Sequence, residues 1–497
     1  MTEFEDLPDL AAERLGGRVL AANDEFFAEK ENLLKAEAAV FIADKYTEQG
    51  KWMDGWETRR RRSPGYDWAV VRLGLPGILR GAIVDTAFFT GNYPESCSLE
   101  ACGLERELTA EEMTNPEGPW TEILPRTPLA GGSANRFALA TTHRATHVRL
   151  NIFPDGGVAR LRLFGEPMPR WPSLPGSFDL AELGTGAFVA AWSDRYFGPP
   201  HKLGLPDAPR GMHDGWETRR RRGPGHDWVI VRLACEGVVE AITVDTAFFK
   251  GNAPGSCTVE GCVSDGLQPP GYAEWTELLP MAPLLPHSAH DFTPTQRAPA
   301  THVRLNIFPD GGVARLRLRG TPTVAGRLEA SLHWLNALPA DAAASELLAC
   351  CASRRWAATV AAARPFSDLA ELDLAAERGA DALDRNDWLE AFAAHPRLGE
   401  RATGSDQHAR WSGGEQSRLD GADAESRTRL AEANRAYERR FGHVFLFCAS
   451  GRSADEMLAA CSARLGNDAA TELAIAAGEQ RKITALRLRK LLGGATP

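Results

Sequence analysis

Long apolar runs are absent from the 497-residue sequence. None reaches the roughly 18 residues of a membrane-spanning helix, and no basic segment followed by an apolar core stands near the start. Cysteines at the CxxC spacing of zinc sites are also absent, and nine cysteines are an odd number for a disulfide framework. Acidic residues outnumber basic ones, which gives a formal net charge of −10 and disfavours a general nucleic-acid binder. We therefore expect a cytoplasmic protein with free buried thiols and neither membrane nor nucleic-acid partners.

A long internal repeat occupies the first two-thirds of the chain. Residues 54–62, Asp-Gly-Trp-Glu-Thr-Arg-Arg-Arg-Arg, recur unchanged as residues 214–222, a spacing of 160. Residues 146–160 recur as residues 301–315. A repeat unit of this length is a complete domain rather than the turn of a solenoid.

Two structural classes follow each other along the chain. In each repeat, short segments rich in β-branched and aromatic residues alternate apolar with polar positions, with glycine, proline, asparagine and aspartate between them. This pattern predicts one all-β sandwich for residues 1–168 and a second for residues 173–322. From residue 326 to residue 497, alanine, leucine, glutamate and arginine dominate, and apolar residues recur at three and four positions. That period predicts an all-α helical domain.

The four consecutive arginines of each repeat allow two main interpretations. Successive side chains of an extended segment point in opposite directions, so Arg59 and Arg61 would share one side. One interpretation is an internal salt-bridge lattice with nearby carboxylates. The other is a clamp in which one or two guanidinium groups bind a substrate carboxylate bidentately. Binding of nucleic acid is the weakest alternative, because the chain as a whole is acidic.

Three repeated segments resemble the allantoicase family. They are residues 54–62, residues 84–92 with the sequence Val-Asp-Thr-Ala-Phe-Phe-Thr-Gly-Asn, and Asn-Ile-Phe-Pro-Asp-Gly-Gly-Val-Ala-Arg at residues 151–160. The resemblance covers residues 1 to about 322. It implies two tandem jelly-roll domains of the galactose-binding type, and hydrolysis of allantoate to (S)-ureidoglycolate and urea.

That reaction needs a cationic clamp, a proton donor for the departing urea, and a base or metal that activates water. Candidates present in both repeats are Glu57, Arg59, Arg61, Asp85, His147, Asp155 and Arg160 in the first, and Glu217, Arg219, Arg221, Asp245, His302, Asp310 and Arg315 in the second. The presence of these residues in both halves is also consistent with a purely structural role. We favour that role for His147, for His302 and for the Asp-Gly-Gly turn. If only one repeat is active, His213 and His226, which replace Met53 and Tyr66, favour the second. Whether the allantoicase half uses a divalent metal is left open.

Three motifs stand out in the helical region. His395 directly precedes Pro396, where a helix normally ends, so its imidazole can face a cleft. Ser412 and Glu415 have the spacing of a helix N-cap and its third residue, which is also the structural interpretation of this pair. Residues 441–451 form an apolar stretch that ends in small residues and lets the backbone approach a ligand.

These motifs resemble the OHCU decarboxylase family, where OHCU is 2-oxo-4-hydroxy-4-carboxy-5-ureidoimidazoline. The resemblance implies cofactor-free decarboxylation of OHCU to (S)-allantoin, with His395 and Glu415 as the catalytic pair. The substrate-binding residues that it implies are Pro396, Ser412, Gln416, Phe447, Cys448, Ala449, Ser450 and Gly451, with Arg487 as a carboxylate partner.

The chain is therefore interpreted as a bifunctional enzyme of purine breakdown that acts on two small-molecule substrates. The main alternative keeps the decarboxylase and makes the tandem sandwiches a non-catalytic ligand-binding module. Whether the chain forms a homo-oligomer is left open.

Overall fold

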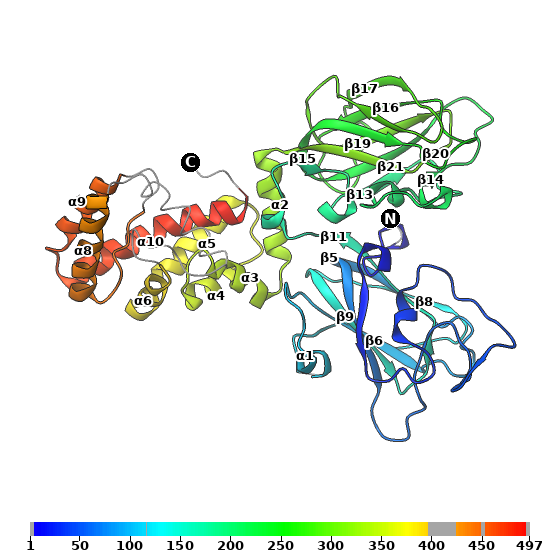
Figure 1. The fold of residues 1–497 in the computed structure, drawn as a ribbon, viewed down its shortest axis with the longest axis horizontal. Helices are drawn as coiled ribbons and strands as arrows, with labels where there is room; N and C mark the ends of the chain where they lie inside the picture. The colour runs from blue at the N-terminus through cyan, green and yellow to red at the C-terminus, as the bar shows by residue number, and fades with distance from the viewer. Residues whose placement is uncertain (1–3, 116, 396–423, 449–452, 494–497) are drawn as a thin grey trace. The chain divides into compact units, whose positions relative to one another are not determined.

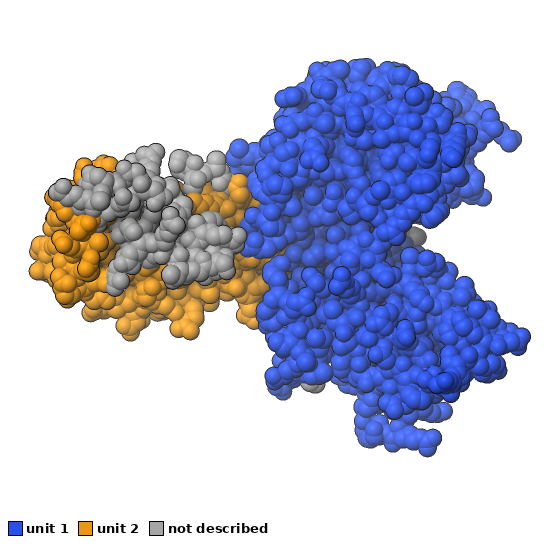
Figure 2. All heavy atoms as spheres, viewed as in Figure 1, with its two compact units in different colours: residues 1–330 blue, residues 331–497 orange. Residues whose placement is uncertain are grey.

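The computed structural model describes residues 4–115, 117–395, 424–448 and 453–493. It divides into two compact units, residues 1–330 and residues 331–497, which are coloured separately in Figure 2. The first unit holds both repeats and is built from strands, and the second is helical (Figure 1). The predicted order of two sandwiches followed by a helical domain is confirmed.

In the first repeat, one long strand belongs to both layers of the sandwich. The first half of β5 (Asp67–Asp85) pairs with β1 and β9, and its second half pairs with β8 and β11. The register to β9 breaks between Arg72 and Gly77, where the strand passes from one layer to the other. The neighbouring strands are β1 (Arg18–Ala22), β6 (Ser96–Cys102), β7 (Thr121–Pro128), β8 (Ala134–Ala138), β9 (Ala145–Phe153) and β11 (Arg160–Pro167).

Smaller elements of the first repeat lie in its loops. Strand β4 (Trp56–Glu57) pairs with β10 (Gly157–Val158), and β2 (Tyr46–Thr47) forms a hairpin with β3 (Gly50–Lys51). The short helix α1 (Ala110–Thr114) follows β6 and begins with a capping box made by Thr109 and Glu112.

The second repeat reproduces this arrangement. Its long strand β15 (Asp227–Asp245) again pairs with four partners, in the same order along its length. The other strands are β12 (Phe178–Asp179), β13 (Phe188–Trp192), β14 (Trp216–Glu217), β16 (Ser256–Cys262), β17 (Thr276–Pro283), β18 (Ala289–Phe292), β19 (Pro299–Phe308), β20 (Gly312–Val313) and β21 (Arg315–Pro322).

Both faces of the central strand β9 are buried, for different reasons. Val148, Leu150 and Ile152 pack into the core between the layers, as the alternating pattern predicts. Arg149 lies on the opposite face, where it stacks 4.8 Å from the Trp120 ring and donates to Glu100. The segment around α1 thus covers a face that alternation alone would assign to solvent.

The cysteine pairs of the repeats also lie on two faces. Cys97 belongs to the core between the layers, and Cys102 packs with Val70 and Leu108 on the other side of the sheet. All nine cysteines are free thiols.

Several helices of the helical unit begin at a side-chain cap. Ser353, Asp368 and Asp384 each accept a hydrogen bond from the first turn of the following helix. Ser453 and Glu456 form a capping box at the start of the helix that follows them. The helices are α2 (Val324–Ala337), α3 (Ala340–Leu348), α4 (Arg354–Ala362), α5 (Leu369–Asp381), α6 (Arg385–Ala393), α8 (Ala424–Phe441), α9 (Ala454–Arg464) and α10 (Ala469–Leu491). Among the described residues, no helix combines the length and apolarity required to cross a membrane.

Candidate functional site

The repeated nonamer is anchored by a buried ion pair. Asp54 accepts a hydrogen bond of 2.8 Å from Arg160 Nη2, and both side chains are buried. The Arg160 guanidinium also donates to the backbone carbonyls of Asn32, Glu37, Asp54 and Ala159. Because each of its three guanidinium nitrogens donates to a protein oxygen, Arg160 holds these loops together inside the sandwich.

Arg59 and Arg61 make separate ion pairs. Arg59 lies 3.1 Å from Asp24 and stacks on Phe26, and it is exposed. The Arg61 guanidinium donates to Asp67 over 2.6 Å, while its backbone N–H donates to Asp155. These contacts are those of the salt-bridge lattice. They also place Asp155 in a turn, where it supports the arginine segment.

The second repeat repeats the lattice residue by residue. Arg219 pairs with Asp194, Arg221 pairs with Asp227, and Asp310 accepts from the Arg221 backbone N–H. Arg315 donates to Asp214 and to the carbonyls of Asp207 and Ala314.

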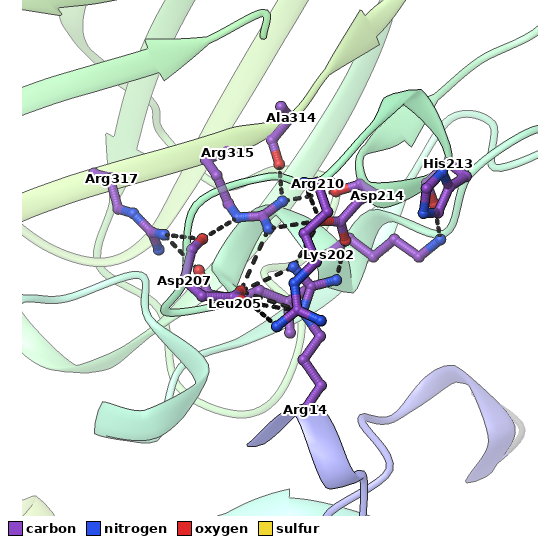
Figure 3. A network of polar contacts seen from close by, with 10 residues as sticks. All are labelled: Arg14, Lys202, Leu205, Asp207, Arg210, His213, Asp214, Ala314, Arg315 and Arg317. Atoms are coloured by element: carbon purple, nitrogen blue, oxygen red, sulfur yellow. Dashed lines mark hydrogen bonds and ion pairs between the residues drawn. The ribbon is translucent and has the colours of Figure 1, made fainter. Parts of the chain in front are cut away.

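One feature of this lattice is asymmetric. Arg14, from the first repeat, reaches across and donates to both Asp207 and Asp214 (Figure 3). Burial alone would raise the pKa of Asp214, but hydrogen bonds from Arg14 and the charge of Arg315 lower it to about 2. Position 184 in the second repeat, which corresponds to Arg14, is a glycine, so Asp54 has no such partner and meets Lys35 instead, at 3.6 Å.

The two strand histidines are buried in the sheets. His147 contacts the Thr146 hydroxyl over 2.9 Å, and His302 contacts the Leu267 carbonyl over 3.2 Å. Burial, followed by the charge of Arg72, lowers the pKa of His147 to about 4, and burial lowers that of His302 to about 4. Both rings are therefore neutral near pH 7. The structural role that we favour for these histidines stays a prediction, as does the catalytic alternative.

The imidazoles peculiar to the second repeat have separate surroundings. His226 contacts Asn306 over 3.2 Å and packs on Phe308, as Tyr66 packs on Phe153 in the first repeat. His213 is exposed, and its backbone carbonyl accepts from Lys202. The structure does not bring these two side chains into contact with each other.

A pocket of about 470 Å³ opens in the first repeat. It is lined by Phe27, Phe41, Lys51, Met53, Glu57, Phe88, Thr90 and Asn92. Glu57 is the one predicted site residue among them, and it accepts a 2.6 Å hydrogen bond from Asn92 Nδ2. Burial raises the pKa of Glu57, while the Asn92 bond acts in the opposite direction. A half-buried carboxyl group with a raised pKa in a mainly apolar pocket is typical of an acid–base group.

The backbone beside the pocket is strained. Phe88 has φ +68°, a conformation that bulky residues rarely adopt, and its ring is 44% exposed. Asp85, another predicted site residue, accepts from the Ala87 backbone N–H and thereby supports this turn. Asp85 itself does not line the pocket. A residue that lines the pocket thus has a strained backbone conformation, which is a common property of ligand sites.

Sequence reasoning missed Lys51, Phe88, Thr90 and Asn92. Lys51 lies in a stretch that only the first repeat possesses: 29 residues separate Phe26 from Trp56, but 19 separate Tyr196 from Trp216. The ten additional residues include the β2–β3 hairpin. The difference in length was the available signal, and a search for residues common to both repeats could not detect it.

The second repeat keeps part of this site. Asn252 donates to Glu217 as Asn92 does to Glu57, and Phe248 has φ +70°. There the Phe248 N–H donates to His287 Nδ1 over 2.7 Å. Asp245 supports the turn through the Ala247 N–H. The second repeat thus retains the carboxyl–amide pair as Glu217 and Asn252 but lacks the β2–β3 hairpin. The imidazole of His287 accepts a hydrogen bond from its turn.

In the helical unit, the structure describes only some of the predicted site residues. His395 follows α6, is half-buried, and donates from its backbone to the Phe392 carbonyl. Phe447 and Cys448 are half-buried, and Arg487 in α10 is fully buried. The remaining predicted residues, Pro396, Ser412, Glu415, Gln416, Ala449, Ser450 and Gly451, lie outside the described residues.

A buried polar network leads to Phe447 and Cys448. Arg464 donates to Glu472 over 2.8 Å and to the Leu446 carbonyl over 2.8 Å. Tyr437 also donates to Glu472, which is fully buried. The Cys448 N–H donates to Glu479 over 2.7 Å. These bonds hold the backbone at Leu446 and Cys448, on either side of Phe447.

Comparison with known proteins agrees with this division. A model described as "Allantoicase repeat" matches residues 8–168 and 178–323. The chain belongs to the allantoicase family. A probable allantoicase of Pseudomonas aeruginosa is 47% identical over 327 residues, covering 64% of this chain and 97% of its own length. The crystal structure of allantoicase from Saccharomyces cerevisiae, 36% identical, covers 63% of this chain and 92% of its own, with a TM-score of 0.53.

The helical part adds a second enzyme family. A model described as "OHCU decarboxylase" matches residues 336–489. The chain is therefore a bifunctional enzyme of ureide metabolism that combines an allantoicase with an OHCU decarboxylase, and both families act on small-molecule substrates. Within the described ranges, no group of three or more His, Cys, Asp or Glu side chains is arranged to hold a metal ion.

Proposed function

We propose that allantoate is hydrolysed to (S)-ureidoglycolate and urea in the pocket of the first repeat, within a sandwich of residues 1–168. This proposal departs from the sequence-based prediction, in which His213 and His226 favour the second repeat. The second sandwich, residues 173–322, supports the first through contacts such as that of Arg14 with Asp207. Residues 326–497 decarboxylate OHCU to (S)-allantoin without a cofactor. The observation that carries the first assignment is Glu57, because it is the only acidic side chain lining the pocket.

The chemistry of allantoate suits this pocket. Its central carbon bears one carboxylate and two ureido groups, and one ureido group departs as urea only if its nitrogen gains a proton. Glu57, with its raised pKa, holds a proton closer to neutral pH than an ordinary glutamate does, and so can donate it to that nitrogen. Once ionised, the same carboxylate can take a proton from the water that attacks the central carbon. The Asn92 amide holds the carboxyl group in position for both transfers.

The repeats provide a matched test of this assignment. Glu57→Gln keeps the shape of the side chain and removes its proton, so we expect kcat for allantoate to fall by about 100- to 10,000-fold. Glu217→Gln is the control, because Asn252 binds Glu217 in the same way within the second repeat. Its kcat should stay within about twofold of the original. The reverse result would place the site in the second repeat. Urea release unchanged in both variants would favour a binding module.

For the helical domain, we propose His395 and Glu415 as the catalytic pair, supported by the family match. His395 would direct the leaving carboxylate or reprotonate the ring carbon, while Glu415 would orient the substrate hydroxyl. His395→Ala and Glu415→Ala should each abolish acceleration of OHCU decay, followed by loss of its ultraviolet absorbance. Allantoate hydrolysis by the same preparations is the internal control for folding. Full decarboxylation rates in both variants would reject the pair.

A further inference from the structure

We propose that Lys51 binds the carboxylate of the substrate, and that the hairpin carrying it makes the first repeat selective for ureido acids over uncharged ureido compounds. This inference rests on the proposed function and extends it to the recognition of the substrate's charge.

Lys51 lines the pocket and can bind an anionic ligand there. It is the only basic side chain among the residues that line the pocket. Its Nζ lies 4.5 Å from the centre of the Phe41 ring, and Phe41 stacks on Phe88 at 5.7 Å. The aromatic surfaces remove water from one side of the ammonium group without neutralising it. Across the parts of the chain that the structure describes, Lys51 makes no ion pair with a carboxylate.

The rest of the pocket matches the remaining groups of a ureido acid. Asn92 and Thr90 provide amide and hydroxyl groups that can hydrogen-bond a neutral ureido group. Glu57 is the only acidic residue in the lining, and it favours its neutral form more than an ordinary glutamate does. One cation in a pocket that also presents an amide, a hydroxyl and aromatic rings therefore favours a ligand with one negative charge and several amide-like groups.

The second repeat lacks this cation. Its corresponding segment is ten residues shorter, and no hairpin is present between Tyr196 and Trp216. The pair Glu217 and Asn252 remains there. Recognition of the carboxylate is thus the function that the additional residues of the first repeat supply.

The hairpin also provides a control residue. Lys45 contacts the Trp52 ring at 3.7 Å, so it makes a similar cation–π contact, but it does not line the pocket. Lys51→Gln and Lys45→Gln therefore remove the same charge from the same hairpin, and only the first removes it from the pocket.

The test measures both turnover and binding. For allantoate, we expect Lys51→Gln to raise KM by about 10- to 100-fold, the loss typical of one hydrogen bond to a charged group, while Lys45→Gln stays within about twofold. Lys51→Arg should restore most of the affinity. By calorimetry, the unaltered chain should bind N-carbamoylglycine more tightly than its uncharged amide, and Lys51→Gln should lose that preference. OHCU decarboxylation by each variant verifies that the chain is folded.

The outcomes separate this inference from the proposed function. An unchanged KM and an unchanged preference for the carboxylate in Lys51→Gln would overturn the role of Lys51, even if Glu57→Gln abolishes turnover. A preference retained by Glu57→Gln and lost in Lys51→Gln supports the carboxylate site, even if Glu57 proves dispensable for hydrolysis. Equal losses in Lys45→Gln and Lys51→Gln would mean that the net charge of the hairpin acts, and would also overturn the proposal.

Discussion

The first and second repeats hold Arg160 and Arg315 in the same way, yet only the first repeat has a hairpin over its carboxyl–amide pair. Residues that are identical in the two repeats mostly build ion pairs inside the sandwich. The segment between Phe26 and Trp56, which differs, contributes Phe27, Phe41, Lys51 and Met53 to the pocket. Here, identity between the copies marks the ion pairs that both sandwiches require and also the Glu57–Asn92 pair, whereas the difference in length marks the segment that completes the pocket of the first repeat.

Exchanging the hairpin tests this comparison most severely. Replacing residues 35–53 by residues 205–213 should preserve the sandwich, because the Asp207 carbonyl meets Arg315 as the Glu37 carbonyl meets Arg160. It removes Lys51, Phe41 and Met53 from the pocket. We expect kcat/KM for allantoate to fall by about 1,000-fold or more, as urea release will report. Hydrolysis at the original rate in a folded chimera would show that the hairpin is irrelevant.

The buried aspartates should differ in their contribution to stability. Asp214→Asn leaves both Arg14 and Arg315 without their shared carboxylate, whereas Asp54→Asn affects Arg160 and the more exposed Lys35. Breaking a buried pair costs about 3 to 5 kcal/mol, and we expect Asp214→Asn near the upper end and Asp54→Asn near the lower. Urea unfolding followed by tryptophan fluorescence will measure the difference. Equal losses would mean that the bridge from Arg14 adds nothing.

The same aspartate predicts how stability changes with pH. Because the pKa of folded Asp214 is about 2 and its ordinary value is 3.8, the unfolded chain binds this proton first as the pH falls. The stabilisation is present above pH 4 and is lost as the pH falls from there toward 2. The melting temperature should therefore decline less steeply over that range in Asp214→Asn. Parallel declines would assign the acid sensitivity to other carboxylates.

The smallest expected effect on substrate binding concerns the turn at Gly132, beside the pocket residue Thr90. Gly132 and His287 occupy equivalent positions with φ +61° and +53°. Gly132→His should destabilise the fold by about 1 kcal/mol, and its new Cβ would meet the Thr90 methyl group at 3.3 Å, so KM for allantoate should rise slightly. His287→Gly should leave KM unchanged. Thermal unfolding and steady-state kinetics will show whether only the first change reaches the pocket.

Much of the architecture could be predicted from the sequence. Alternation of apolar and polar residues predicted the strands of both sandwiches, and the apolar period of three to four residues predicted the helices of the third domain. The site was harder to predict. Glu57 lines the pocket, but Arg61 and Arg160 pair with internal aspartates. The sequence shows that an arginine is present, and it does not show whether its partner is an internal aspartate or a substrate.

The sequence by itself determined the duplication, the two fold classes and the residues that both sandwiches need, because these depend on periodicity and on identity at constant spacing. Only the tertiary structure decided which carboxyl group and which cation line the same cavity. Lys51, Glu57 and Asn92 lie on three separate segments that meet only when β5 and the hairpin are in place. Burial then raises the pKa of Glu57, and that property arises from the packed surroundings of the side chain.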